Sequence, residues 1–358
     1  MSQAMSGEQP GGAASAPLRL PANFVPRFYR GGSRLGPFRR IATGPYDGED
    51  WVGSTTQALG APEGLGPSRL ADGRLLAEAV AADPEGFLGP DHVAAFGTST
   101  ELLVKLLDPD ERLAVHYHPD QEFARIHLGC AHGKTEAWVV LDAPADGAVH
   151  LGFREEVSAE ALAALSQAQD SVAMLAALNR VPVQAGDAIL VPAGVPHAVG
   201  AGVFAVELQE PTDWSLMLEH AGLDLGEGGE WHLGLGPDMA LAAVDRSGWT
   251  PERLAELRLP APLPLAPGVA RLLPERADPF FRAESVSAGA LLAAAFSVLV
   301  CVDGELALVD EAGGRTVMTA GESVLLPYRY GRCALEGSGR AVRCLPPPTD
   351  SAAVTGAR

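Results

Sequence analysis

The sequence predicts a mainly β protein made of tandem sandwiches or barrels of antiparallel strands with helical insertions. Three observations lead to this fold class. Short apolar stretches rich in Val, Leu and Ile alternate with Gly, Pro and Asp along most of the 358 residues, a pattern typical of strands joined by turns. Helical periodicity is confined to a few segments. One strand-and-turn motif occurs twice, which indicates one structural unit used two times.

Two helical insertions are expected on this β scaffold, at about residues 64–97 and 158–180. Within them, residues 72–82 and 158–179 place Leu, Val and Ala three and four positions apart, as on the apolar side of a helix. Ser158 is suited to cap the start of the second insertion's helix, because its hydroxyl can accept a bond from a free backbone amide.

The expected strands are short and are separated by turn residues. Asp303 and Gly304 lie between two apolar runs, and Asp-Gly in such a place predicts a β-hairpin. A short third helix is expected after Thr250, a capping residue followed by a proline suited to the first turn. The stretches with a strand pattern include residues 101–107, 137–141, 188–191, 203–208 and 296–302.

The chain divides at a proline-rich segment. Residues 259–268 read LPAPLPLAPG, and these prolines disfavour both a helix and a central strand. On either side, residues 185–192 and 320–327 share the order Ala-Gly-acid, apolar strand, proline. We therefore expect a disordered tail (1–19), a first unit with the helical insertions (20–258), a linker (259–268) and a second unit (269–358).

Composition and charge exclude several classes of protein. The 45 acidic residues outnumber the 26 Lys and Arg, and the formal net charge of -19 repels nucleic acids and acidic membrane surfaces. Four cysteines without a C-x-x-C pair are too few for a disulfide framework, so a reducing cytoplasm is expected. The N-terminus lacks the features of a signal peptide. The most apolar run, residues 288–302, is too short to span a bilayer.

One group of residues matches a metal site. His116 and His118 lie two positions apart, so on a strand both imidazoles face the same side. Glu136 begins the next apolar run, and His197 follows a glycine turn, a strand and a tight Pro-x-Gly turn. Three imidazoles and one carboxylate suit Zn, Mn or Fe and leave positions open for a substrate. A His-x-His pair alone is more often hydrogen-bonded in the core or at the surface, so the metal prediction depends on all four residues.

These elements resemble the two metal-binding signatures of the cupin superfamily, H-x-H with a later Glu and G-x5-P-x-G-x2-H. The chain is most similar to the class I mannose-6-phosphate isomerases, zinc-dependent aldose-ketose isomerases built from tandem cupin jelly rolls with helical insertions. The likeness spans residues 20–345, and Arg30-Gly-Gly32 and Glu49-Asp-Trp51 are similar to family segments without copying them. The stretches that carry the likeness are 102–107, 118–120, 133–136, 186–197 and 207–213.

The resemblance implies a site, position by position, in the first unit, which would be the catalytic cupin domain. The metal-ligand positions hold His116, His118, Glu136 and His197. The family normally has Gln at the first of these. The positions assigned to acid-base chemistry or sugar contact retain Lys134, Glu207 and Asp213. The expected cofactor is one zinc ion, with manganese and iron as alternatives.

Four other family positions are not retained. The family's Ser, Tyr, Arg and Lys are replaced by Ala114, Val199, Met217 and Leu223, respectively. Ser, Arg and Lys are groups that would hold a phosphate dianion, so their joint loss weakens the case for a phosphorylated sugar. A neutral sugar, or one held by other cations such as Arg30 or Arg34, is the alternative.

The second unit lacks the metal signature. In the second copy of the motif, Arg332 stands at the histidine position, and no His-x-His precedes it. We therefore expect a metal-free, cupin-like unit with a structural or oligomerising role. The oligomeric state itself does not follow from the sequence.

The resemblance implies a metal-dependent aldose-ketose isomerase of carbohydrate metabolism, acting through an enediol on a sugar or sugar phosphate. Glu207 would move a proton between adjacent carbons, and Lys134 and Asp213 would hold the hydroxyls. Without catalysis, Glu207 would be a strand-end carboxylate facing water and Lys134 a solvated turn residue. Two alternatives keep the fold: a non-catalytic sugar-binding cupin, and an Mn or Fe cupin oxygenase or decarboxylase.

Overall fold

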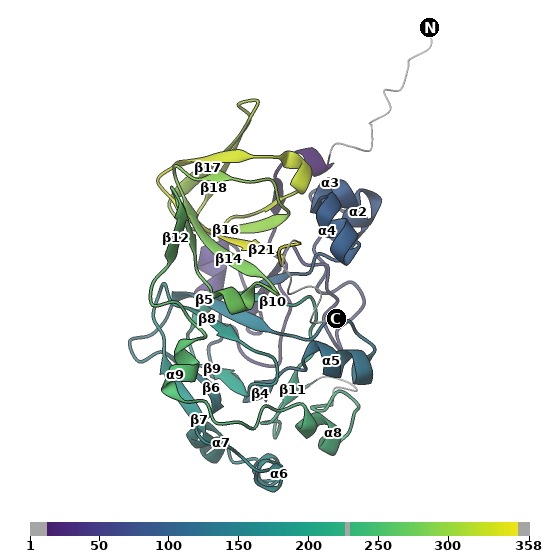
Figure 1. The fold of residues 1–358 in the computed structure, drawn as a ribbon, viewed down its shortest axis with the longest axis vertical. Coiled ribbons are helices and arrows are strands. Elements are labelled where there is room, and N and C mark those ends of the chain that lie inside the picture. The colour runs from purple at the N-terminus through teal and green to yellow at the C-terminus, as the bar shows by residue number, and fades with distance from the viewer. Residues whose placement is uncertain (1–12, 226–229, 350–358) are drawn as a thin grey trace.

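The computed structural model describes residues 13–225 and 230–349. Two β-sandwiches are stacked along the long axis of the molecule, one formed mainly by the N-terminal part of the chain and one by the C-terminal part (Figure 1). The strands of every sheet pair antiparallel. The predicted mainly β fold class is confirmed.

The first sandwich consists of two five-stranded sheets, which we call the inner and the outer sheet. The inner sheet has the order β2 (Glu49–Val52), β3 (Leu103–Leu107), β10 (Phe204–Gln209), β5 (Glu136–Asp142) and β8 (Ala188–Val191). The outer sheet has the order β11 (Leu216–Met217), β4 (His116–Tyr117), β9 (His197–Val199), β6 (Ala148–Phe153) and β7 (Leu178–Pro182).

The second sandwich pairs a seven-stranded sheet with a four-stranded sheet. The larger sheet has the order β1 (Leu18–Leu20), β19 (Ser323–Leu326), β16 (Ser297–Asp303), β21 (Arg340–Leu345), β14 (Arg282–Ser287), β13 (Val269–Arg271) and β12 (Leu263–Ala266). The smaller sheet has the order β15 (Leu291–Leu292), β20 (Cys333–Gly337), β17 (Glu305–Asp310) and β18 (Arg315–Thr319).

Helices lie on the outside of the sandwiches (Figure 1). The first insertion contains α2 (Leu76–Ala82), α3 (Pro84–Leu88) and α4 (Pro90–Phe96), and the second contains α6 (Ala159–Ala168) and α7 (Ser171–Ala177). The predicted short helix is α9 (Pro251–Ala255). The others are α1 (Leu35–Arg39), α5 (Gln121–Phe123), the π-helical turn η2 (Ala124–Leu128), α8 (Pro237–Ala242), and the 3-10 turns η1 (Ala13–Ser15), η3 (Glu275–Ala277) and η4 (Tyr328–Tyr330).

The second insertion contains two helices where the periodicity predicts one. Ser158 caps α6 as predicted, and its hydroxyl accepts a bond from the amide of Ala161 at 3.1 Å. The helix ends at Gln169, whose φ of 50° places it in the left-handed region. Asp170 then starts α7 by accepting bonds from two backbone amides. A local cap thus interrupts a continuous apolar pattern.

The repeated motif has the same local structure in both sandwiches. Gly186 and Gly321 have φ values of 97° and 87°, a backbone conformation that favours glycine. Each glycine precedes a fully buried strand, β8 in the first sandwich and β19 in the second. The motif therefore marks equivalent places in the two units.

Two predicted boundaries differ from the structure. Residues 1–12 of the predicted tail lie outside the described residues, whereas residues 13–19 form η1 and the start of β1. The strand forms because Leu20 is buried and β1 pairs with β19 of the second sandwich. Within the predicted linker, β12 pairs with β13 as an exposed edge strand, a place in a sheet that tolerates proline.

The hairpin predicted at Asp303 and Gly304 is wrong, although a turn does form there. Gly304 has a φ of 62°, as a tight turn requires. However, β16 pairs with β19 and β21, while β17 pairs with β18 and β20. The turn therefore carries the chain from one sheet of the second sandwich to the other.

The inner sheet is buried on both faces. One face packs against the second sandwich in a shared core, in which Val104 and Val206 belong to the same cluster as Val298 and Val342. The other face turns toward the outer sheet and carries charged side chains. Burial on both faces explains why β3 and β10 are almost continuously apolar in sequence. Within the described residues, every helix is too short or too polar to cross a membrane.

Candidate active site

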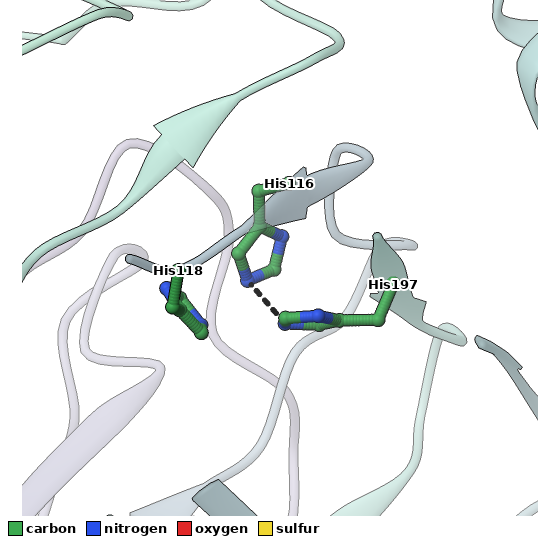
Figure 2. A group of neighbouring side chains, drawn as sticks. All are labelled: His116, His118 and His197. Atoms are coloured by element: carbon green, nitrogen blue, oxygen red, sulfur yellow. Dashed lines mark hydrogen bonds between the residues drawn. The ribbon is translucent and has the colours of Figure 1, made fainter. Parts of the chain in front are cut away.

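The outer sheet brings three histidines together. β4 pairs with β9 so that His116 lies directly opposite His197, 81 residues further along the chain. The ring centre of His118 is 5.1 Å from that of His116 and 4.9 Å from that of His197. Figure 2 shows the three imidazoles turned toward one another. The structure therefore assembles the predicted histidine set.

Each of the three rings is held by a backbone carbonyl group. Nδ1 of each ring lies 2.8 Å from a carbonyl oxygen, and the acceptors are Ala114, Trp214 and Val195. A neutral imidazole has one N–H, so donation from Nδ1 leaves Nε2 as a bare acceptor. Nε2 of His116 nevertheless lies 3.1 Å from Nε2 of His197, the contact dashed in Figure 2. Two acceptors at this distance repel unless a cation lies between their lone pairs, as in a metal site.

Glu136 joins the histidines from the inner sheet. It is the first residue of β5 and is 1% exposed. Its Oε2 lies 3.0 Å from Nε2 of His118, and its Oε1 lies 3.2 Å from Nε2 of His197. Nζ of Lys134 is 3.2 Å from Glu136 Oε2 and 3.1 Å from His118 Nε2. The ammonium group of Lys134 thus lies between the carboxylate of Glu136 and the imidazole of His118.

Burial sets the protonation states of this group. Burial and the neighbouring rings lower the pKa of His116 well below its ordinary value. Burial and the ammonium group of Lys134 lower the pKa of His118 to about 3. Burial alone would raise the pKa of Glu136, but Lys134 and His118 hold it well below its ordinary value. At neutral pH the two imidazoles are neutral and the carboxylate is ionised, which are the states that metal ligands need.

Glu207 lines the same cavity as His116 and Glu136. It lies on β10, paired with Lys105 of β3 on one side and Trp138 of β5 on the other, and it is 4% exposed. Burial raises the pKa of Glu207 to about 8, although Nζ of Lys105 is only 3.9 Å away. A carboxyl group that titrates near neutral pH can accept a proton and return it.

A buried charged cluster beside Glu207 was not predicted from the sequence. At its centre, the carboxylate of Glu49 lies 3.4 Å from Nζ of Lys105 and 3.4 Å from Nε of Arg27. It also accepts hydrogen bonds from Tyr29 at 2.5 Å and Trp51 at 2.7 Å. One signal was present, because a lysine in the middle of an apolar strand must find buried carboxylates.

Asp213 lies behind this cluster. Its Oδ2 accepts bonds from the guanidinium of Arg27 at 3.1 Å and from the amide of Leu59 at 3.0 Å. Its Oδ1 lies 4.0 Å from Nζ of Lys105. Asp213 is not among the residues that line the cavity. Its contacts instead hold two cations and the segment around Leu59.

The cavity lies between the two sheets of the first sandwich, with a volume of about 50 Å³, enough for a few water molecules. The inner sheet lines it with Glu49, Lys105, Glu136 and Glu207. The outer sheet and the segment before it line it with His116, Leu113, Ala114, Val199 and Met217. One wall is therefore charged, and the other combines His116 and Ser215 with apolar side chains.

The cations expected as substitutes for the missing family residues lie elsewhere. Arg34 pairs with Asp142 at 2.5 Å near the surface, and the guanidinium of Arg30 lies over the ring of Tyr46 at 5.9 Å from its centre. Neither arginine lines the cavity, and neither does Leu223. Arg27, which the sequence did not single out, is the arginine on its surface.

Comparison with known proteins places these residues in context. No protein-family model matches the chain. A mannose-6-phosphate isomerase of Bacillus subtilis is 35% identical over 123 residues, which are 34% of this chain and 38% of that protein. A probable mannose-6-phosphate isomerase of the same organism is 32% identical over 197 residues, 55% of this chain and 59% of that protein. The matched segments thus span less than two thirds of these relatives.

Solved structures match over nearly the full chain. The mannose 6-phosphate isomerase of Bacillus subtilis has a TM-score of 0.70 at 21% identity, covering 92% of this chain and 99% of that one. A variant of the phosphomannose isomerase of Salmonella typhimurium has a TM-score of 0.71 at 18% identity, covering 93% and 100%. At these identities the likeness establishes the fold. In fold over nearly its whole length, and in sequence over the matched segments, the chain is similar to mannose-6-phosphate isomerases.

Proposed function

We propose that this protein is a metal-dependent aldose-ketose isomerase that interconverts an aldose and a ketose through an enediol. One observation carries the proposal: a buried carboxyl with a pKa of about 8, Glu207, lines the same cavity as His116 and Glu136, two members of a converging group of three imidazoles and a carboxylate. A metal site and a proton-transfer group in one enclosed space are what this reaction needs. The similarity to mannose-6-phosphate isomerases supports it.

The residues fit a divalent metal ion. His116, His118 and His197 would offer Nε2, and Glu136 a carboxylate oxygen, a set that suits zinc and also accepts manganese or iron. When bound, the metal would supply Lewis acidity at a carbonyl or hydroxyl oxygen of the sugar. The carbonyl bonds to Nδ1 would fix the ring orientations.

Glu207 would move the proton. Its ionised carboxylate takes the proton from C2 of the aldose, the C–H electrons form the C1=C2 bond of the enediol, and the carbonyl oxygen gains a proton. Return of the proton from Glu207 to C1, with loss of the O2 hydroxyl proton as the C2=O bond forms, gives the ketose; the proton lost from O2 balances the one that O1 gained. Lys105, with Nζ 3.9 Å away, would stabilise the ionised form of Glu207. Lys134 would donate a hydrogen bond to a sugar oxygen, because its Nζ lies among the ligand atoms. Asp213 would position Arg27.

We propose a supporting role for the second sandwich and a cytoplasmic location for the protein. Two sandwiches of cupin type share a core, and the second, with Arg332 at the position equivalent to His197, would support the first. The four cysteines are free thiols, and three of them are buried, as expected for the reducing cytoplasm.

The test is an isomerisation screen with protein stripped of metal by a chelator and then reloaded. Zinc, manganese and cobalt would each be added, with phosphorylated and free aldoses and ketoses as substrates. We expect metal-dependent isomerisation and incorporation of solvent deuterium at the carbon that receives the proton. Sugar binding without turnover would indicate the non-catalytic alternative. Oxygen consumption with manganese or iron would indicate an oxygenase.

A further inference from the structure

We infer that Arg27, together with the hydroxyl group of Ser215, binds the phosphate group of a phosphorylated sugar in this cavity. The inference rests on the proposed function, because it assigns residues for substrate selection at the same site. Both side chains line the cavity. Neither belongs to the metal-binding or proton-transfer groups described above.

Two buried carboxylates hold the guanidinium group of Arg27 in place. Its Nη1 donates to Oδ2 of Asp213 at 3.1 Å, and its Nε lies 3.4 Å from the carboxylate of Glu49. Its Nη2 donates to none of the residues that the structure describes. Because the side chain is 16% exposed, this nitrogen remains available to a ligand. A guanidinium group that is already oriented loses little conformational freedom when it binds an anion.

Ser215 supplies a second donor, from the wall that carries the apolar side chains. It follows Asp213, the partner of Arg27, by two residues and directly precedes β11. Its hydroxyl group forms no hydrogen bond with the rest of the described chain, and the residue is only partly buried. A hydroxyl group without a partner on a cavity wall can donate to a phosphate oxygen.

The charges around the cavity favour an anion once the divalent ion of the proposed function is bound. Without that ion, three cations offset three carboxylates, namely Arg27, Lys105, Lys134, Glu49, Asp213 and Glu136. The ion adds two positive charges, and Glu207 offsets one of them when it is ionised and none when it is protonated. The sum is positive in both states. A phosphate dianion would compensate this buried charge, whereas an uncharged sugar would not.

Arg27 is separated from the proton-transfer group, as a residue that binds the far end of a sugar must be. Nζ of Lys105 lies 3.9 Å from Glu207 and 3.4 Å from Glu49. Glu49 in turn lies 3.4 Å from Nε of Arg27. Two residues thus lie between Glu207 and Arg27. This order places the phosphate subsite away from the carbon atoms that exchange a proton with Glu207.

A matched pair of substrates tests the inference. Zinc-loaded protein would be assayed with mannose 6-phosphate and with mannose. We expect kcat/KM to be at least about 10-fold higher for the phosphorylated sugar, because only this sugar gains the contacts with Arg27 and Ser215. An equal or higher kcat/KM for mannose would overturn the inference.

Two variants test the assigned residues. Ser215→Ala removes the hydroxyl group and leaves every ion pair intact, so it should lower the ratio of the two kcat/KM values by about 5-fold or more. Arg27→Lys keeps the charge but cannot form two parallel bonds, so it should lower the ratio by about 10-fold or more. In both variants we expect the change mainly in KM for mannose 6-phosphate.

The ratio distinguishes substrate selection from a structural role, because a structural defect would lower kcat/KM for both sugars alike. If either folded variant keeps the original ratio, the inference falls. If Arg27→Lys does not fold, Ser215→Ala decides it. Arg34→Lys is the matched control, because Arg34 pairs with Asp142 outside the cavity, and it should keep the ratio. A 10-fold fall in the ratio for this control would overturn the inference, because the phosphate would then be bound elsewhere.

Binding measurements separate this inference from the proposed function. If neither sugar is isomerised, the proposed function fails, and calorimetric titration with mannose 6-phosphate still decides the roles of the two residues. The zinc-loaded unaltered protein, Ser215→Ala and Arg27→Lys would be compared. Weaker binding to each variant supports the inference. Unchanged binding to either variant, or no binding to the unaltered protein, overturns it.

Discussion

Backbone carbonyl groups, and not other side chains, orient the candidate metal ligands. Nδ1 of His116 and Nδ1 of His197 each bond to a carbonyl two residues earlier in the chain, so strand geometry alone fixes these rings. His118 is different, because its carbonyl partner, Trp214, is 96 residues away. Its orientation depends on how the chain returns after β10. The metal site is therefore sensitive to His118 in particular.

Replacing His118 with Ala should sharply reduce metal content. The variant removes one of four ligands, and no neighbouring group can take its place at the same geometry, so we expect at least a 10-fold loss of metal affinity. Elemental analysis after dialysis checks this. His127→Ala, which changes an exposed histidine outside the cavity, is the control and should retain its metal. A full equivalent of metal in His118→Ala would contradict the ligand assignment.

Replacing Glu207 with Gln should remove the proton-transfer group without disturbing the metal. Gln keeps the shape and the hydrogen bonding of Glu but cannot accept a proton at neutral pH. We expect turnover to fall by roughly 10²–10⁴-fold with metal content unchanged. Turnover and deuterium incorporation from solvent would both be measured. Near-normal turnover would mean that the base lies elsewhere.

The carboxyl group of Glu207 should also make the free energy of unfolding depend on pH. Its pKa rises from an ordinary 4.5 to about 8 in the folded protein, so between these values the folded state holds a proton that the unfolded state has released. Stability from this group is therefore present below pH 4.5 and is lost as the pH rises toward 8. The Glu207→Gln variant lacks this loss. Between pH 4.5 and 8 its free energy of unfolding, relative to that of the unaltered protein, should therefore rise by at most about 1.4 kcal/mol per pH unit. Urea unfolding of both proteins across this range checks it; a constant difference would contradict the raised pKa.

The candidate site could be predicted only in part, and the physical reason is clear at the level of residues. His116 and His118 were identifiable because a strand places every second residue on one side. Glu49 and Arg27 were not, because they act through contacts that join distant segments, Glu49 with Lys105 and Arg27 with Glu49. Asp213 was retained from the resemblance, but its surroundings show it bonded to Arg27.

At the scale of elements, local signals located turns and caps better than they predicted pairing. The strands β3, β5, β8, β10 and β16 lie where apolar stretches were found. The turn at Gly304 was also found, but its strands belong to different sheets. Pairing depends on burial of whole sheet faces, which a window of a few residues does not contain. The break between α6 and α7 at Asp170 was not predicted, because the apolar pattern continues across it.

Asp170 should contribute measurable stability as the cap of α7. Its side chain accepts bonds from two backbone amides, at 3.0 Å each. Asp170→Ala should lower the free energy of unfolding by about 0.5–2 kcal/mol, while Asp170→Asn keeps an acceptor and should cost only a few tenths. Urea unfolding of the two variants gives the comparison. Isomerase activity, measured in parallel, should stay within about two-fold, because surface caps act locally. Equal stability of the two variants would contradict the capping role.

At the scale of the whole molecule, the two sandwiches behave as parts of one packed body. The inner sheet forms one wall of the cavity with one face and packs on the second sandwich with the other. β1, near the start of the described chain, pairs with β19 at the edge of the larger sheet of the second sandwich. The C-terminal half thus covers the face of the inner sheet that points away from the cavity. The second sandwich therefore has a structural role in supporting the inner sheet.

A buried ion pair between Arg39 and Asp50 allows a test of whether the two sandwiches stabilise each other. Nε of Arg39 lies 2.7 Å from the Asp50 carboxylate of the inner-sheet strand β2, and both side chains are at most 4% exposed. The same guanidinium donates to the carbonyl of Gly321 at 2.7 Å and to the hydroxyl of Ser323 at 2.9 Å, both in the second sandwich. One side chain therefore joins the two sandwiches.

Arg39→Met should destabilise the protein by about 3–5 kcal/mol, because it leaves the carboxylate of Asp50 buried without its cation. Adding Asp50→Asn to the same chain removes that charge, so the double variant should recover part of the loss and fall short of the sum of the single effects. Urea unfolding followed by tryptophan fluorescence measures all three variants. Because the core is shared, we expect a single transition in each. A loss below about 1 kcal/mol for Arg39→Met, typical of a surface ion pair, would contradict the inferred link between the two sandwiches.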